Sequence, residues 1–203
     1  IGARFGILPS FMAKWNTKLP GCSGHTHQSL WDKAGTKNLF YDAKDPFRMS
    51  EVFKSYLAGQ ILCLPEILPF FAPTVNSYKR LVEGMWAPTR VTWGVDNRTT
   101  AFRVIPGSKK STRLETRVSG SDINPYLAVA AALGAGLYGI DQKLELPSGP
   151  VAGNAYAVEA PILPRNLHEA AQALAKSEAA RGIFGDDMVE HYSQSRLWEW
   201  RQF

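Results

Sequence analysis

The clearest pattern in this chain is an alternation of charged and less polar side chains over residues 111–118, the run STRLETRV. Because successive side chains on a β-strand point to opposite faces, this run predicts a strand. Arg113, Glu115 and Arg117 would share one face of that strand. The other face would carry Thr112, Leu114, Thr116 and Val118. The sequence therefore predicts a half-buried strand with three charges on the side away from the core.

Residues 25–31 alternate in the same way and predict a second strand, on which His25, His27 and Ser29 share one face. Apolar or alternating stretches predict further strand-like segments at residues 5–15, 90–93 and 99–105. The five-residue spacing of Arg98 and Arg103 would put them on opposite faces of a regular strand. Arg98 is therefore expected either in a turn or beside a β-bulge.

Other stretches carry apolar residues at helical spacing. They are residues 45–64, 126–140, 167–179 and 187–202. Asp45 and Asn124 are good N-cap residues and each is followed by proline, which suits the first turn of a helix. Pro65 is expected to end the first helix.

Strand patterns come first along the chain and helical patterns dominate later, which favours an α+β fold with an antiparallel sheet flanked by helices. Residues 1–145 are expected to form the sheet and the core helices. Residues 146–203 are expected to form a Pro/Gly-rich connector and the C-terminal helices.

Composition narrows the class of protein. The chain has 203 residues and a net charge of +5, but its basic residues are scattered, so nucleic-acid binding is not expected. There is no membrane-length apolar run and no signal-peptide pattern, and the two cysteines, Cys22 and Cys63, are expected to be reduced thiols. We therefore expect a cytoplasmic protein. Because the chain opens with Ile1 and stops inside a helical pattern, we also expect a fragment.

The charges on residues 111–118 call for binding partners. Two guanidinium groups beside one carboxylate on a half-buried strand are costly unless counter-charges neutralise them. The positive charge of the arginines predicts a bound anion, and the negative charge of Glu115 predicts a bound cation, most simply a divalent metal ion. This combination is typical of chemistry on phosphorylated or carboxylated substrates.

Each of these signals has an ordinary alternative. His25 and His27 could be two partly buried histidines with no ligand. Arg80 could hold a carboxylate with two hydrogen bonds, or it could be a surface arginine. The other basic residues could form a solvated face. Trp86 differs from the other tryptophans, which are expected in the core, because it lies in a glycine-containing loop between charged regions.

Taken together, several segments resemble the catalytic domain of the glutamine synthetase family, over nearly the whole chain. They are SGHTHQS at 23–29, APTVNSYKRL at 72–81, DNR at 96–98 with Arg103, RLETR at 113–117, NPYLA at 124–128, and the C-terminal LPRNL at 163–167 and FGDD at 184–187. The resemblance implies ATP, Mg²⁺ or Mn²⁺, and a two-step ligation. ATP would phosphorylate the γ-carboxylate of glutamate, and ammonia or an amine would then displace phosphate.

The resemblance also implies roles for individual residues. His25 and Glu115 match metal ligands, and Arg98 and Arg117 match catalytic arginines. Gly21, Arg80, Arg117 and Trp86 match positions that bind glutamate or the nitrogen donor. The matches on the nucleotide side are His27, Ser29, Arg98, Arg103, Lys110 and Arg113.

One departure bears on the nitrogen donor. In ammonia-using members a glutamate stands at the position of Trp86 and takes the proton from ammonium, which tryptophan cannot do. Members with a non-acidic residue here resemble glutamate–amine ligases, including the γ-glutamylpolyamine synthetase-like branch. A tryptophan could shield the acyl phosphate from water and stack on an alkylammonium ion.

The resemblance further implies a homo-oligomer of stacked rings whose sites are shared between neighbouring subunits. The remaining metal carboxylates are expected upstream of Ile1, so the chain alone is expected to be inactive. The alternative is a non-catalytic relative kept as a structural or assembly protein. The presence of His25, Glu115 and all the matching arginines argues against that alternative.

Overall fold

A computed structural model describes residues 1–203 and contains one four-stranded sheet in the order β1-β4-β3-β2. The strands are β1 (Thr26–Gln28), β2 (Trp93–Val95), β3 (Phe102–Ile105) and β4 (Arg113–Thr116). β4 pairs antiparallel with both β1 and β3, but β2 and β3 run parallel. The prediction of a fold that combines one sheet with helices is confirmed, whereas the expectation of an antiparallel sheet was wrong, because the sheet is mixed.

The parallel pair results from the loop at residues 96–101. Asp96 adopts a left-handed backbone conformation, with φ of 49°. The Thr100 hydroxyl lies 2.9 Å from the Asn97 carbonyl oxygen and 2.8 Å from that of Phe102. These contacts shape the loop that returns the chain, so that Phe102 lies opposite Trp93 and β3 runs parallel to β2.

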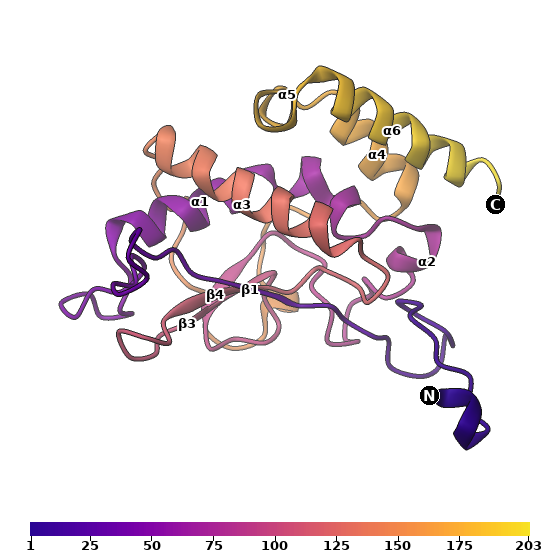
Figure 1. Cartoon of the computed structure of the whole chain (residues 1–203), viewed down its shortest axis with the longest axis horizontal. Coiled ribbons are helices and arrows are strands. Elements are labelled where there is room, and N and C mark those ends of the chain that lie inside the picture. The colour runs from indigo at the N-terminus through magenta and orange to yellow at the C-terminus, as the bar shows by residue number, and fades with distance from the viewer.

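The principal helices lie on one side of the sheet, with α1 (Glu51–Ile67) and α3 (Pro125–Asp141) side by side (Figure 1). Beyond them lie α4 (Leu167–Ala175), α5 (Glu178–Phe184) and α6 (Asp186–Trp200). The remaining elements are short: the helix α2 (Val75–Tyr78) and the 3-10 turns η1 (Gly2–Phe5), η2 (Leu68–Phe70) and η3 (Ala155–Ala157). The N-terminal segment projects away from the sheet and helices (Figure 1).

The helix starts were predicted with mixed success. Asn124 caps α3 as expected, accepting a 3.0 Å hydrogen bond from the Tyr126 amide. α1 is capped by Ser50 instead of Asp45, because Asp45 folds residues 45–49 into a turn by accepting from the Phe47 and Met49 amides. Pro65 does not end α1, because it lies in the last turn and removes only its own N–H donor.

Three other expectations were wrong. Residues 5–15 do not form a strand, since the chain there leaves η1 and continues without regular structure. The predicted helix over residues 167–179 is interrupted after Ala175, because Ser177 caps the separate helix α5. The strand predicted at 90–93 is displaced, since β2 begins at Trp93 and runs to Val95, and the strand predicted at 99–105 is shortened to β3.

Buried polar side chains join the sheet to the helices. Gln28 on β1 donates to the Thr116 hydroxyl at 2.9 Å and accepts from Tyr56 and Gln60 on α1 at 2.7 Å. The Thr116 hydroxyl in turn donates to Gln60 at 2.9 Å. Because the members of a buried polar network satisfy one another, this one fixes β1 in a single position against β4.

The core lies between the sheet and the helices. Phe102, Val104 and Leu114 point into it and are fully buried, as is Cys63 on α1, while the free thiol of Cys22 is exposed. None of the helices is both long and apolar enough to cross a membrane.

The close approach of α1 and α3 depends on glycine. A Cβ atom on Gly139 would lie 2.1 Å from the Ser55 carbonyl oxygen and 2.6 Å from the Gly59 nitrogen. We expect Gly139→Ala to lower the free energy of unfolding by about 1–3 kcal/mol, because the two backbones would have to separate. Thermal and urea unfolding of the purified protein would measure the loss.

The matched control is Gly149→Ala, where an added Cβ meets nothing within 4 Å. That change should shift the free energy of unfolding by no more than about 0.5 kcal/mol. Equal stability of both variants would show that the helices have room to adjust.

Candidate functional site

The register of the sheet places three charged or titratable side chains in one row. His27 on β1 is opposite Glu115 on β4, and Glu115 is opposite Arg103 on β3. Their neighbours along the strands, including Phe102, Leu114 and Thr116, face the buried side of the sheet. The row therefore lies on the face away from α1 and α3, as the alternation in the sequence predicted.

Glu115 is the centre of this cluster and is almost completely buried. Its carboxylate accepts hydrogen bonds from Arg117 at 2.7 Å and Arg103 at 3.1 Å, and lies 2.9 Å from His25 Nδ1. Burial by itself raises the pKa of Glu115, but the hydrogen bonds and positive charges of His25, Arg117 and Arg103 outweigh it and hold the pKa at about 2. The carboxylate is thus ionised and acts only as an acceptor.

Glu115 also fixes the orientation of His25. Since the ionised carboxylate can only accept, the 2.9 Å contact requires Nδ1 of His25 to carry the proton. The other ring nitrogen, Nε2, is buried and has no hydrogen-bond partner. This is the arrangement in which a carboxylate prepares a histidine to bind a metal ion.

His25 and Glu115 fit a divalent cation, but no group of three His, Cys, Asp or Glu side chains is arranged to enclose one. The Glu115 oxygens face His25 and the arginines. In this structure Glu115 therefore supports His25 as well as being a potential ligand in its own right.

His27 and Arg113 form the outer edge of the cluster. The Arg113 Nε donates to His27 Nδ1 at 3.1 Å, and His27 Nε2 lies 3.8 Å from Glu115. Burial lowers the pKa of His27, and although Glu115 opposes this, Arg113 and the other nearby positive charges add to it. The ring is therefore biased towards its neutral form.

Arg80 is buried, with 4% of its surface exposed, which rules out the surface alternative. Its guanidinium donates to the backbone carbonyl of Val118 at 2.5 Å and contacts no carboxylate of the chain, while its Nε is buried without a partner. Burial lowers its pKa to about 10, so it stays cationic at neutral pH. Gly21 lies against it, since a Cβ there would sit 2.8 Å from Arg80 Cγ.

Arg80 and Arg117 belong to one patch of positive charge. Arg80 also lies 3.4 Å from the carbonyl oxygen of Arg117. Burial lowers the pKa of Arg117, the positive charges of Arg103 and Arg98 add to this, and Glu115 opposes it. The positive charge of these arginines exceeds what Glu115 can neutralise, so the patch favours anions.

Arg98 lies in the loop between β2 and β3, as the turn alternative predicted, and lines an open pocket together with Arg103. The remaining residues singled out from the sequence make no contact with Glu115. The Ser29 hydroxyl accepts from Trp31 at 2.9 Å, and Lys110 is exposed in the turn between β3 and β4. Trp86 is 69% exposed and has a left-handed backbone, with φ of 58°.

Tyr156, which lies in η3 of the connector, was not among the site residues predicted from the sequence. Its hydroxyl is buried near the backbone amide of Trp86 without a hydrogen bond of normal geometry. Burial raises the pKa of this phenol, and the positive charge of Arg117 opposes the rise. A single tyrosine in a Pro/Gly-rich connector carries no signal of such a position.

The connector is held on the Arg98 loop by hydrogen bonds. Asn97 donates to the carbonyl oxygens of Val151 at 2.9 Å and Gly153 at 2.8 Å, and the Ala155 amide donates to the Thr99 hydroxyl at 2.9 Å. These contacts place Tyr156 beside the patch formed by Arg80 and Arg117.

Comparison with known proteins shows the family of the chain. The family model described as glutamine synthetase, catalytic domain, matches residues 1–203. Type-1 glutamine synthetase 2 of Dictyostelium discoideum is 54% identical over 202 residues, which are 98% of this chain and 39% of that protein. A glutamate–isopropylamine ligase of a Pseudomonas species is 43% identical over 205 residues, 100% of this chain and 44% of that protein.

Among solved structures, a GmaS/ADP complex superposes with a TM-score of 0.88 at 36% sequence identity, covering 98% of this chain and 47% of that one. The chain belongs to the glutamine synthetase family and corresponds to its catalytic domain. It spans less than half the length of these relatives.

The cluster around Glu115 makes a testable prediction about stability. Glu115→Ala would leave Arg103 and Arg117 without their counter-charge in a largely buried setting. We expect the free energy of unfolding to fall by about 3 kcal/mol, as measured by urea denaturation.

Glu178→Ala is the control, because Glu178 is exposed and makes no ion pair. Its effect should stay within about 0.5 kcal/mol. If Glu115→Ala were as mild as this control, Glu115 would not be the residue that holds the cluster together.

Proposed function

We propose that the protein containing this chain is an ATP-dependent ligase that joins the γ-carboxylate of glutamate to ammonia or a small amine. The observation that carries the proposal is the cluster in which Glu115 binds His25, Arg103 and Arg117 at the edge of a cationic patch. Two of the relatives support it by name, since one is a glutamine synthetase and the other a glutamate–isopropylamine ligase.

We assign nucleotide binding to the side of the cluster formed by β1, β3 and β4. We assign His27, Ser29, Arg103, Lys110 and Arg113 to ATP, with Arg98 facing the transferred phosphate. The similarity to a GmaS/ADP complex supports a nucleotide here. Arginines suit this task because their forked donors match phosphate oxygens.

We assign Mg²⁺ or Mn²⁺ to His25, with Glu115 as its supporting or direct carboxylate. The support is the buried, unpartnered Nε2 of His25 and the contact that orients the ring. A bound divalent ion would supply charge neutralisation for the phosphate oxygens. Further ligands would be oxygen atoms, which this ion prefers.

Glutamate would be held by Arg80 and Arg117, with Gly21 leaving room beside Arg80. In the first step a γ-carboxylate oxygen attacks the γ-phosphorus of ATP, and the bond to the bridging oxygen of ADP breaks. Arg98 and Arg117 would stabilise the charge on the transferred phosphoryl group. In the second step the neutral amine form of the nitrogen donor attacks the acyl carbon, the acyl C–O bond to phosphate breaks, and the departing phosphate takes the proton that the nitrogen loses.

The nitrogen donor is the finer part of the proposal, and Trp86 points to an amine. An indole cannot accept a proton from ammonium, but its face attracts an organic ammonium ion. The indole is exposed on its loop and so is accessible to a substrate. From the resemblance to the glutamine synthetase family we also propose a cytoplasmic homo-oligomer of stacked rings, in which neighbouring subunits share active sites.

A comparison of nitrogen donors tests the function. We expect ATP hydrolysis by the full-length protein to require both glutamate and a nitrogen donor, with alkylamines or polyamines preferred over ammonium. Phosphate release would be measured with ammonium, putrescine, spermidine and monoamines in turn. Strong turnover with ammonium and none with amines would contradict our assignment of Trp86, and no turnover with any donor would favour the non-catalytic alternative.

Substitution of Arg117 tests the site itself. We expect Arg117→Ala to keep the fold but to lower kcat/KM about a hundredfold, because a donor to the developing charge is lost. Circular dichroism would confirm folding, and Arg201→Ala, an exposed arginine on the last turn, is the matched control. Activity of Arg117→Ala equal to that of the control would remove Arg117 from the site.

A further inference from the structure

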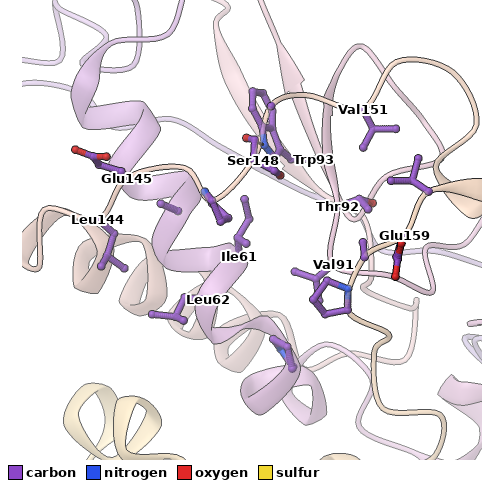
Figure 2. Close-up of a pocket in the computed structure, with 17 residues that line it drawn as sticks. Ile61, Leu62, Val91, Thr92, Trp93, Leu144, Glu145, Ser148, Val151 and Glu159 are labelled. Atoms are coloured by element: carbon purple, nitrogen blue, oxygen red, sulfur yellow. Dashed lines mark hydrogen bonds between the residues drawn. The ribbon is translucent and has the colours of Figure 1, made fainter.

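Several buried polar atoms lack hydrogen-bond partners and belong to two short segments, residues 78–80 and 117–122. They are Tyr78 Oη, Arg80 Nε, Arg117 Nε, Ser119 Oγ and Asp122 Oδ1. No such atom lines the cavity of about 560 Å³ between α1 and β2, where Ile61, Leu62 and Trp93 present apolar surface (Figure 2). The two segments that carry Arg80 and Arg117 are therefore the part of the molecule whose polar contacts need an explanation.

Asp122 joins the second of these segments to α2 through its other oxygen. Its Oδ2 accepts a 2.6 Å hydrogen bond from the Ser77 hydroxyl and a 2.9 Å hydrogen bond from the Thr74 hydroxyl. Thr74 and Ser77 also form the capping box of α2, in which the amide of each donates to the hydroxyl of the other, at 3.0 and 3.1 Å. Because it accepts from both hydroxyls, the Asp122 carboxylate fixes the first turn of α2.

The same turn places Arg80. The Arg80 amide donates to the Ser77 carbonyl oxygen at 3.1 Å, so the backbone of Arg80 is bonded to the residue that Asp122 holds. At the far end of the side chain, the guanidinium donates to the carbonyl oxygen of Val118. Residues 118–122 therefore hold Arg80 at both ends, the guanidinium directly and the backbone through Ser77.

The charge of Asp122 acts on Arg80 as well. Burial lowers the pKa of Arg80, and the negative charge of Asp122 is the strongest influence that opposes the fall. The carboxylate does this without contacting the guanidinium, because its hydrogen bonds go to Thr74 and Ser77. The donors of Arg80 are thus left free of any carboxylate of the chain.

We propose that Asp122 is a positioning residue for glutamate, which holds the turn that presents Arg80 to the substrate and does not touch the substrate itself. The inference rests on the proposed function, because it takes Arg80 as a residue that binds glutamate. It adds that the affinity for glutamate depends on a carboxylate outside the cluster around Glu115.

Steady-state kinetics of Asp122→Ala in the full-length protein test the proposal. We expect KM for glutamate to rise about tenfold, because the turn before Arg80 loses its acceptor, while kcat and KM for ATP stay within about twofold. Asp141→Ala is the matched control, because Asp141 is exposed and makes no ion pair. An unchanged KM for glutamate, or an equal rise in KM for both substrates, would overturn the proposal.

Asp122→Asn separates the hydrogen bonds from the charge. Its amide oxygen can still accept from Thr74 and Ser77, and its NH2 group would take the place of Oδ1, which has no partner. We expect KM for glutamate to rise no more than about threefold in this variant. A rise as large as that of Asp122→Ala would show that Asp122 acts on Arg80 by charge alone, and the positioning role would be wrong.

Hydrogen exchange tests the contact with α2 without any turnover. We expect the amides of residues 78–80 to exchange about tenfold faster in Asp122→Ala than in the wild-type protein, and at an unchanged rate in Asp141→Ala. Normal wild-type turnover with unchanged exchange and unchanged KM in Asp122→Ala would contradict this inference alone. A wild-type protein without glutamate-dependent turnover would contradict the proposed function and this inference with it.

Discussion

The site depends on one buried carboxylate. Glu115 accepts from two arginines and orients a histidine within hydrogen-bonding distance, and it does so while almost excluded from water. Without it, Arg103 and Arg117 would face each other with no counter-charge, and like charges repel more strongly at low dielectric. With it, the cluster is stable and still retains excess positive charge for an anion.

The rest of the fold keeps this carboxylate in place. The pairing of β4 with β1 and β3 puts His27, Glu115 and Arg103 in one row, and the Gln28–Gln60–Thr116 network behind that row fixes β1 on α1. Glycines let α3 approach α1 closely enough to cover the other face. The connector is hydrogen-bonded to the Arg98 loop and places the phenol of Tyr156 at the edge of the patch.

Much of this could be predicted from the sequence where a local pattern decides the structure. The alternation in residues 111–118 predicted which face would carry Glu115, and Asn124-Pro125 predicted the start of α3. The parallel pairing of β2 and β3 could not be predicted, because it depends on a left-handed Asp96 and on hydroxyl contacts within the loop. Tyr156 and the backbone partners of Arg80 depend on contacts between residues far apart in the chain, and no spacing reveals those.

The account makes its most direct claim about His25, which Glu115 leaves with one free ring nitrogen. The decisive measurement is the anomalous scattering of Mn²⁺ in crystals of the full-length protein grown with ADP. The account predicts a manganese peak bonded to His25 Nε2, with Glu115 in contact with the ion or with the opposite side of the imidazole. A manganese ion bound beside the nucleotide with no bond to His25 would contradict it.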